Sequence, residues 1–237
     1  MASPAMKQAE FDKFAEEYLS THAQNLKISG EDPEFFARYK IDEIRRRWTR
    51  EGRPEPKSVL DFGCGIGAAL PYLAKNFPTA RLTGLDVSDK SLAIARSRIP
   101  AAVELVRHDG GNALPIAPAS QDLIFTACVF HHIDEAQHEA LFANFATLLK
   151  PGGVLCVFEH NPINPVTRYI VATCPFDENA VLIPAGTLKA RLKRSGFGKV
   201  GVAYTGFFPG ALRAFRPLEP SLKAVPLGAQ YYAWAHA

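Results

Sequence analysis

The chain lacks long hydrophobic runs, paired cysteines and a strong charge of either sign, and each absence excludes a class of protein. No apolar stretch in its 237 residues reaches the length of a membrane span, and residues 1–7 lack the apolar core of a signal peptide. The four cysteines contain no C-x-x-C pair, so neither a zinc site nor a redox pair is predicted. The net charge of +3 does not indicate a nucleic acid or a membrane surface as partner. We therefore expect a cytoplasmic protein in a reducing environment.

Several catalytic motifs are missing as well. The histidines have no H-E-x-x-H spacing, and no metal site is predicted. There is no G-x-S-x-G turn for a nucleophilic serine and no Walker-type lysine after a glycine loop. What remains is an ordinary globular composition, with 47% apolar and 22% charged residues, and a length that suits one α/β domain with a full core.

A glycine-rich turn after a short apolar run is the most informative feature that is present. Gly63, Gly65 and Gly67 occupy every second position, and Asp61 stands two residues before the first of them. Glycines allow the backbone to turn tightly and a flat ligand to lie against it. A second apolar run follows and ends in Asp86. This order predicts a strand, a nucleotide-binding turn, a helix and a second strand that ends in an acid.

The acid before the turn separates two kinds of ligand. A dinucleotide would place its pyrophosphate over the turn, where helix N–H groups favour an anion, and Asp61 would oppose that charge. S-adenosylmethionine carries an ammonium and a sulfonium instead, and an acid here can hold the ammonium. Asp86 is placed to accept both ribose hydroxyls. The dinucleotide fingerprint also fits Gly63, Gly65 and Ala68, so a nicotinamide-dependent oxidoreductase stays as an alternative.

Four segments resemble, in order and at normal spacing, the motifs of class I S-adenosylmethionine-dependent methyltransferases. The resemblance covers roughly residues 59–159. It implies a Rossmann-like fold, S-adenosylmethionine as cofactor and a methyltransferase of the small-molecule type. The flanks, which would identify the acceptor, are less diagnostic. The four segments are residues 61–67 (DFGCGIG), residues 86–88, residues 107–110, and residues 122–133 together with 148–155.

The resemblance also implies a set of cofactor-binding residues. Asp109 in the third segment would face the adenine amino group, and Tyr18 on the N-terminal helices would reach the carboxylate of the cofactor. For Asp61 and Asp86 the alternative is a helix cap or a turn carboxylate, and for Asp109 it is the turn that D-G-G-N favours. The full set comprises Tyr18, Asp61, Gly63, Cys64, Gly65, Gly67, Asp86, Val87, Ser88, Asp109, Gly110 and Cys128.

Two polar segments at the ends of expected strands supply candidate catalytic residues. His131 and His132 follow the fourth strand, near the expected position of the activated methyl group, and a histidine there can accept a proton from an acceptor hydroxyl. Glu159 and His160 end the fifth strand and are alternative bases. The structural alternative is that these residues cap helices or form turns, for which the two Asn-Pro pairs that follow are sufficient.

The alternation of apolar runs and amphipathic segments predicts an α/β fold with a doubly wound, seven-stranded, mostly parallel sheet. Residues 1–56 are expected to form an N-terminal helical lid, and residues 57–237 the Rossmann-like methyltransferase domain, within a single domain overall. Helices are expected at residues 161–172 and 186–195, and a small helical insertion at 207–227. Strands are expected at residues 57–62, 81–86, 102–107, 121–127, 153–159, 198–204 and 229–234.

These patterns together predict methyl transfer from S-adenosylmethionine to a small-molecule acceptor, with oxygen as the first candidate atom and carbon as the second. The loop after the fourth strand lacks the Asn/Asp-Pro-Pro-Tyr/Phe sequence that resembling amino-methylating enzymes often carry. The alternatives are a methyltransferase that acts on RNA or protein, a nicotinamide-dependent oxidoreductase, and a binding module without an acceptor pocket. We expect no membrane and no nucleic-acid partner.

Overall fold

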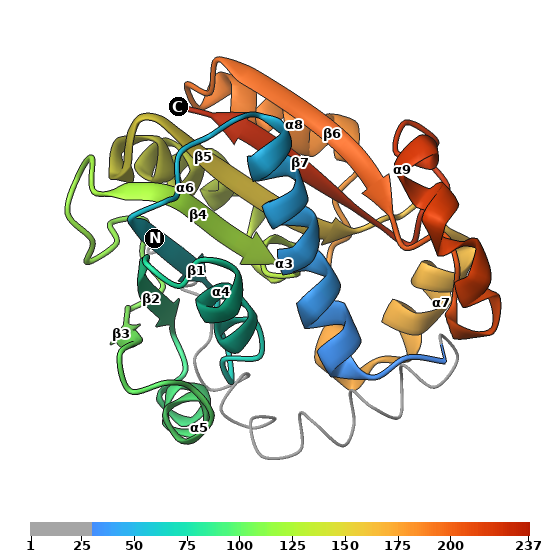
Figure 1. Cartoon of the computed structure of the whole chain (residues 1–237), viewed down its shortest axis with the longest axis horizontal. Coiled ribbons are helices and arrows are strands. Elements are labelled where there is room, and N and C mark those ends of the chain that lie inside the picture. The colour runs from blue at the N-terminus through green and yellow to red at the C-terminus, as the bar shows by residue number, and fades with distance from the viewer. Residues whose placement is uncertain (1–29) are drawn as a thin grey trace.

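One mixed β-sheet forms the centre of the structure, a computed structural model that describes residues 30–237 (Figure 1). The apolar runs of the sequence form its strands, and β1 is buried at all of its positions. Within the described range the seven strands are β1 (Ser58–Phe62), β2 (Arg81–Asp86), β3 (Glu104–Arg107), β4 (Gln121–Ala127), β5 (Leu149–His160), β6 (Lys199–Thr205) and β7 (Gln230–His236).

The strand order is β3-β2-β1-β4-β5-β7-β6. The neighbours from β3 to β5 pair in parallel, and β7 lies antiparallel between β5 and β6. The predicted seven-stranded, mostly parallel sheet is therefore confirmed. The strand order reverses between β1 and β4, and ligands of such sheets bind outside the carboxyl ends of the strands at this reversal. The topology alone thus directs attention to the loops after β1 and β4.

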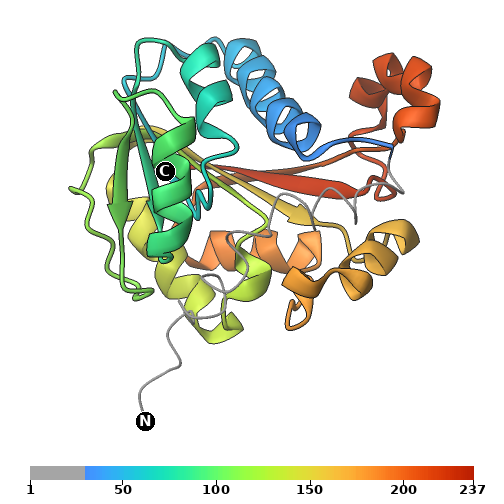
Figure 2. The same ribbon diagram turned by 90° about the horizontal axis from the view of Figure 1, so that it is seen from below.

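Helices cover both faces of the sheet (Figure 2). The first face carries α3 (Pro33–Arg50), α4 (Leu70–Asn76) and α5 (Asp89–Arg98), and the opposite face carries α6 (Glu135–Leu148) and α8 (Ala185–Arg194). Among residues 30–237, no helix combines the length and the apolar character that a membrane span requires. The chain is thus doubly wound, as the alternation of elements predicts.

Two apolar clusters join these layers. On the first face, Ile41, Ile44 and Trp48 of α3 are almost fully buried against the sheet. On the opposite face, Phe142 and Phe145 of α6 pack into the second cluster. At about 25 cal/mol for each Å² of apolar area removed from water, such clusters supply the main favourable term in folding. Helix α3, which lies within the segment 1–56 predicted to form a lid, is therefore part of the core.

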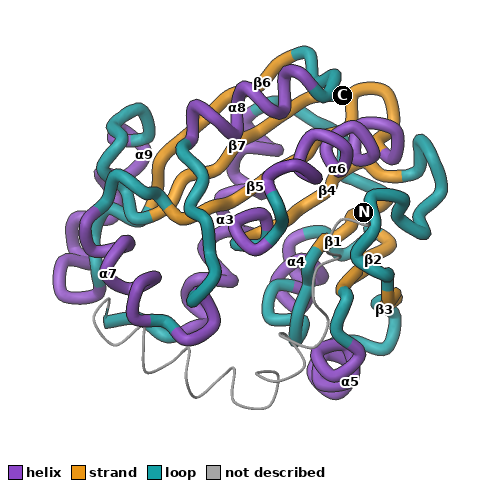
Figure 3. The backbone as a smooth tube through the Cα atoms, turned by 180° about the vertical axis from the view of Figure 1, so that it is seen from behind, coloured by secondary structure: helices purple, strands orange, loops and turns teal. Residues whose placement is uncertain are grey.

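The remaining helical elements stand at one end of the molecule, near the carboxyl ends of β5 and β6 (Figure 3). They include α7 (Pro165–Thr173) and α9 (Glu219–Leu222), with the 3₁₀ segment η4 (Gly210–Leu218) before α9. The helical insertion expected at residues 207–227 corresponds to η4 and α9. Helix α7 begins at Pro165 because the Asn164 side chain accepts a hydrogen bond from Thr167 N at 2.9 Å.

The start of β5 differs from the sequence expectation. We expected a strand from residue 153, but β5 begins at Leu149. The pairing with β4 shifts register between Gln121 and Leu123, and this irregularity accommodates the Lys150-Pro151-Gly152 segment that reads as a loop in the sequence. A bulge of this kind lets a strand continue through residues that interrupt its regular pairing.

Candidate active site

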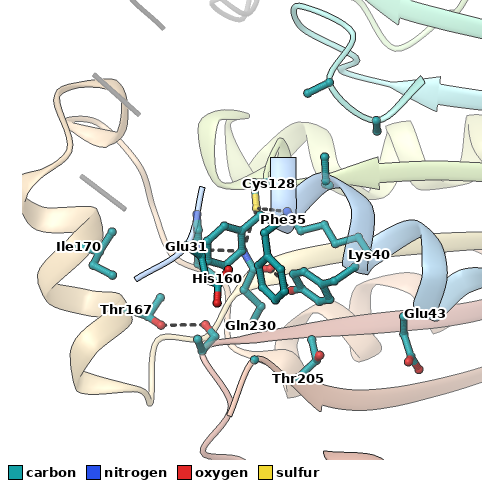
Figure 4. Close-up of a pocket in the computed structure, with 18 of the residues that line it drawn as sticks. Glu31, Phe35, Lys40, Glu43, Cys128, His160, Thr167, Ile170, Thr205 and Gln230 are labelled. Carbon is teal, nitrogen blue, oxygen red and sulfur yellow. Dashed lines mark hydrogen bonds between the residues drawn. The ribbon is translucent and has the colours of Figure 1, made fainter. Parts of the chain in front are cut away.

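A cavity of about 1110 Å³ lies at the carboxyl edge of the sheet. Its lining comes from the turn after β1, the end of β2, the loop after β4, the end of β5, and the helices α3 and α7. Figure 4 shows Cys128 and His160 at its centre, with Thr167 and Ile170 of α7 on one side and Thr205 on the other. Pockets for one drug-sized ligand measure about 300–1,000 Å³, so this cavity has room for a cofactor and an acceptor together.

One end of the cavity is acidic. Asp61 is buried at the end of β1, and its Oδ2 atom has no hydrogen-bond partner among the described residues. Burial, together with the charge of Asp86, raises the pKa of Asp61 to about 8. A buried carboxyl without a partner is costly, and a cationic group in the cavity would relieve that cost. The acidic end of the cavity therefore suits a cationic group.

Asp86 lies beside this place at the end of β2. Its two carboxylate oxygens accept hydrogen bonds from Gly65 N at 2.8 Å and Ser88 N at 2.9 Å. Each carboxylate oxygen has a second acceptor position. Asp86 thus ties the glycine turn to β2, and its role toward the ribose hydroxyls stays a prediction.

The glycine turn has the backbone that its sequence predicts. Gly63 and Gly65 have φ angles of +73° and +52°, in the left-handed region that favours glycine. A Cβ atom at Gly63 would lie 2.4 Å from a methyl group of Val129, whereas a Cβ atom at Gly65 would meet no described atom within 4 Å. Gly63 therefore permits close packing against the loop after β4, and Gly65 leaves open space at the wall of the cavity.

A cation that sequence reasoning missed lies between the two ends of the cavity. Lys40 of α3 is buried, lines the cavity and places its Nζ atom 3.8 Å from Cys128 Sγ (Figure 4). Tyr18, which was predicted to reach the cofactor's carboxylate, lies outside the described residues. Lys40 offers a positive charge for a carboxylate in the same cavity. Its only signal in the sequence is its place on the buried face of an amphipathic helix.

The other predicted cofactor residues divide into two groups. Cys64, Val87 and Cys128 line the cavity, whereas Gly67 packs against Ala95 of α5 and against Ile99, which follows that helix. Asp109 lies at a separate, smaller hollow, where its Oδ1 accepts a hydrogen bond from Gly111 N at 2.8 Å, and Gly110 follows it with a φ of +83°. This is the turn geometry that the alternative interpretation predicts, so the role of Asp109 toward adenine stays a prediction.

Ser88 has a structural role at the start of α5 and is not among the residues that line the cavity. Its hydroxyl accepts a hydrogen bond from Ser91 N at 3.0 Å and caps α5. We expect Ser88→Ala to lower the free energy of unfolding by about 1 kcal/mol, the usual worth of such a cap, and to change S-adenosylmethionine affinity less than about twofold. Denaturant unfolding and calorimetric titration measure the two effects. A loss of affinity above tenfold would instead place Ser88 in the cofactor site.

The other end of the cavity is built from histidines and carboxylates. The 3₁₀ turn η2 (Phe130–His132) places His131 with Nδ1 at 2.6 Å from Glu159 Oε2 and Nε2 at 3.4 Å from Asp177 Oδ1. His132 Nε2 lies 3.4 Å from the same Asp177 oxygen. Burial alone would lower the pKa of His131, but the Glu159 carboxylate raises it well above its ordinary value. His131 therefore holds its proton at neutral pH in this geometry and is not available to accept another.

His132 and His160 differ from His131 in their surroundings. Burial lowers the pKa of His132, which keeps this ring neutral and able to accept a proton. His160 lies beside Cys128, and burial would raise the pKa of that thiol, but His160 and Lys40 lower it to about 7. Both histidines line the cavity. Of the predicted bases, His132 has the protonation state that proton transfer needs.

Glu159 lies behind the cavity wall rather than in it. It is fully buried, and its Oε1 accepts a hydrogen bond from Phe130 N at 2.9 Å while Oε2 contacts His131. Both oxygens are thus engaged inside the protein, and the expectation that Glu159 contacts the acceptor does not match this placement. Its position instead fixes the orientation of His131. Asp177, which sequence reasoning missed, lies in the 3₁₀ segment η3 (Pro175–Asp177), far from the motifs along the chain.

The roof of the cavity joins the start of α3 to η4. Arg216 of η4 forms an ion pair with Glu31, and its guanidinium lies 4.3 Å from the centre of the Phe35 ring. All three residues line the cavity. Two segments that are far apart in sequence therefore close one side of the site.

Comparison with known proteins agrees with this geometry. Residues 59–153 match a family model that is described as a methyltransferase domain. The trans-aconitate 2-methyltransferase of Acidovorax sp. (strain JS42) is 37% identical over 130 residues, which cover 53% of this chain and 48% of that protein. The malonyl-(acyl-carrier protein) O-methyltransferase of Hahella chejuensis (strain KCTC 2396) is 35% identical over 107 residues, which cover 45% of this chain and 37% of that protein.

A solved structure extends the similarity to nearly the whole chain. The structure from Thermotoga maritima, described as an S-adenosylmethionine-dependent methyltransferase and possible histamine N-methyltransferase, has a TM-score of 0.64 at 19% identity and covers 96% of this chain and 98% of that chain. This likeness establishes the fold. The matched segments span about half the length of the two curated relatives or less, so their acceptors remain properties of those proteins.

Proposed function

The chain carries a class I S-adenosylmethionine-dependent methyltransferase domain, and we propose that it transfers the methyl group to an oxygen of a small acceptor held in the same cavity. The observation that carries this proposal is the unsatisfied Asp61 carboxyl at one end of a cavity whose other end is lined by histidines. A cation is needed at the first end, and a polar acceptor suits the second.

The residues present fit the cofactor. Asp61 can pair with its ammonium, Asp86 is the carboxylate beside the glycine turn that would take its ribose hydroxyls, and Lys40 offers a charge to its carboxylate. The open space at Gly65 leaves room for a flat group against the turn. A pyrophosphate, by contrast, would lie against the Asp61 and Asp86 carboxylates, and this opposes a nicotinamide-dependent function.

S-adenosylmethionine supplies a methyl group on a positively charged sulfur, which is an excellent leaving group. The main task of the protein is therefore to hold the acceptor oxygen about 3 Å from that methyl group and in line with it. In the transfer, an oxygen lone pair forms the new C–O bond, the electrons of the broken C–S bond return to sulfur, and a hydroxyl acceptor loses its proton. His132 and His160 line the acceptor end, and His132, whose pKa is lowered by burial, is the side chain that can receive this proton.

The acceptor is a small molecule in this proposal because the cavity is roofed by α3, η4 and their Arg216 contacts. Oxygen is the first candidate because one curated relative is an O-methyltransferase by name. Carbon is the second candidate, and RNA or protein acceptors are a further alternative.

Two measurements on the full chain test the proposal. First, the melting temperature is recorded with S-adenosylmethionine and with NAD, and we expect stabilisation by the first alone. Second, S-adenosylmethionine with a labelled methyl group is incubated with a metabolite extract, and labelled products are identified by mass spectrometry. Hydrolysis of the product by mild base would indicate a methyl ester.

The outcomes separate the alternatives. Stabilisation by NAD without S-adenosylmethionine would overturn the proposal. Binding of S-adenosylmethionine without transfer to any metabolite would indicate a binding module, and transfer to added RNA or protein would replace the small-molecule acceptor.

A further inference from the structure

Three metal-ligating side chains converge at the acceptor end of the cavity. They are His131 and His132 from the turn after β4 and Asp177 from the segment after α7. One ligand atom from each lies within 4.8 Å of the others. We propose that these three residues bind one divalent transition-metal ion, with zinc as the representative.

The distances from Asp177 to the two histidines are compatible with a shared metal ion. Both histidine Nε2 atoms lie 3.4 Å from Asp177 Oδ1. Typical N–H···O hydrogen bonds measure about 2.7–3.2 Å, so these two contacts are longer than typical. Two ligands on one tetrahedral zinc ion, with bonds of about 2.0–2.1 Å, lie about 3.3 Å apart. The two distances to Asp177 therefore match the spacing of ligands around one ion, and the ligand atoms of all three residues lie within 4.8 Å of one another. Two imidazoles and a carboxylate are also a donor set that first-row transition metals prefer.

A second carboxylate orients one of the ligands. Glu159 Oε2 lies 2.6 Å from His131 Nδ1, so the Nε2 atom of His131 is the one that points to Asp177. Histidines that bind metals almost always donate the other ring N–H to a carboxylate or a carbonyl. Glu159 is fully buried and is held in turn by Phe130 N. This arrangement assigns Glu159 a purpose that its position outside the cavity otherwise leaves without explanation.

The two ligand-bearing segments are fixed to each other through the backbone. Val181 N donates a hydrogen bond to the carbonyl oxygen of His131 at 2.8 Å, and the Tyr231 hydroxyl donates to the carbonyl oxygen of Ile183 at 2.7 Å. The first bond holds the segment that follows Asp177 against the turn after β4, and the second holds it to β7. The ligands are therefore positioned in the absence of an ion, which lowers the cost of binding one.

The sequence does not predict this site because its ligands come from separate segments. Only His131 and His132 are adjacent, and neighbouring residues on a short turn form no recognised metal motif. The fold adds the third ligand by returning the chain after α7 to the loop after β4.

The metal site also gives the proposed methyl transfer a way to bind its acceptor. This part of the inference rests on the proposed function. All three ligands line the cavity at the acceptor end, so an oxygen of the acceptor can occupy an open position on the ion. A bound metal lowers the pKa of a coordinated hydroxyl. His132 then acts as a ligand rather than as a base, and the proton passes to water. Metal binding itself does not depend on the methyl-transfer proposal.

Zinc binding to the full chain tests the site. The protein is stripped with a chelator, dialysed and titrated calorimetrically with zinc chloride, and bound zinc is also measured by elemental analysis. We expect about one zinc ion per chain and a rise in melting temperature of about 5–10 °C at saturating zinc. Asp177→Asn and His132→Ala should each weaken zinc binding by more than about 100-fold, because loss of an outer partner alone costs 10–100-fold.

Two control variants make the result specific. Glu178→Gln removes the exposed acid next to Asp177 and should bind zinc as the wild type does. Cys128→Ala removes the thiol in the same cavity. The proposal is overturned if the wild type binds no zinc, if both ligand variants bind it normally, or if zinc is lost only in Cys128→Ala. Melting curves without zinc show whether each variant is folded.

Titration of the same stripped protein with S-adenosylmethionine keeps the two proposals separate. Binding of S-adenosylmethionine without zinc binding would remove the metal site and leave methyl transfer intact. Zinc binding without S-adenosylmethionine binding would retain the metal site and remove the methyl-transfer proposal. Loss of methyl transfer on stripping, with restoration by zinc, would connect them.

Discussion

Replacement of Asp61 by asparagine should abolish a proton release that accompanies S-adenosylmethionine binding to the wild-type protein. Because the pKa of Asp61 is about 8, most of these carboxyls are protonated at pH 7 in the free protein. The positively charged ammonium favours the ionised carboxylate, so binding at pH 7 should release most of one proton. The release should fall toward zero as the pH rises above 8, where Asp61 is already ionised.

The same substitution should weaken the affinity. A hydrogen bond to a charged group contributes about 1.5–3 kcal/mol, so Asp61→Asn should raise the dissociation constant about 10- to 100-fold. Calorimetric titrations in buffers of different ionisation enthalpy measure the affinity and the proton release together.

Asp89→Asn is the matched control, because Asp89 is an exposed acid in the first turn of α5, only a few residues from Asp86. It should release protons and bind as the wild type does. Equal proton release from Asp61→Asn and the wild type would show that Asp61 does not contact the ammonium.

Removal of the Glu159 side chain should produce a second large effect, on stability. The buried carboxylate accepts a hydrogen bond from Phe130 N and lies 2.6 Å from His131 Nδ1. Breaking a buried charge pair typically costs about 3–5 kcal/mol, because the remaining partner is left buried without compensation. For a chain of this size we therefore expect Glu159→Ala to lower the melting temperature by about 6–20 °C, measured without metal.

Two further variants serve as references for this result, Glu159→Gln and Glu104→Ala. The amide of Glu159→Gln can still accept a hydrogen bond from Phe130 N but does not carry the negative charge, so its melting temperature should fall between those of the wild type and Glu159→Ala. Glu104 is exposed on β3, and its replacement should change stability by no more than about 0.5 kcal/mol. A melting temperature of Glu159→Ala within about 2 °C of the wild type would refute the burial argument.

The sheet could be predicted from sequence because its signals are local. The run before Gly63 and the run that ends in Asp86 each have the length and composition of a buried strand. The glycines after the first run permit the tight turn that follows it. The start of β5 at Leu149 could not be predicted, because a bulge depends on the neighbouring strand rather than on the residues that form it.

The residues of the candidate site also divide into those with a local signal in the sequence and those without one. The acids of the cofactor end, Asp61 and Asp86, are close in sequence to the glycine turn, and the motif identifies them. Lys40 lies on α3 and Asp177 lies in η3, and tertiary packing brings both to the cavity. No spacing in the sequence indicates either residue. Glu159 was recognised as a polar residue at a strand end, but its role depends on which way its side chain points, and only the structure gives that direction.

The position of β7 in the sheet determines when the sheet can be completed during synthesis of the chain. β6 pairs with β7 alone, and β7 comes later in the chain yet occupies the place between β5 and β6. Until residues 230–236 have left the ribosome, β5 keeps an unpaired edge and β6 has nothing to bond to. Unpaired edges of this kind promote aggregation. A nascent chain that stalls before residue 230 should therefore depend on chaperones.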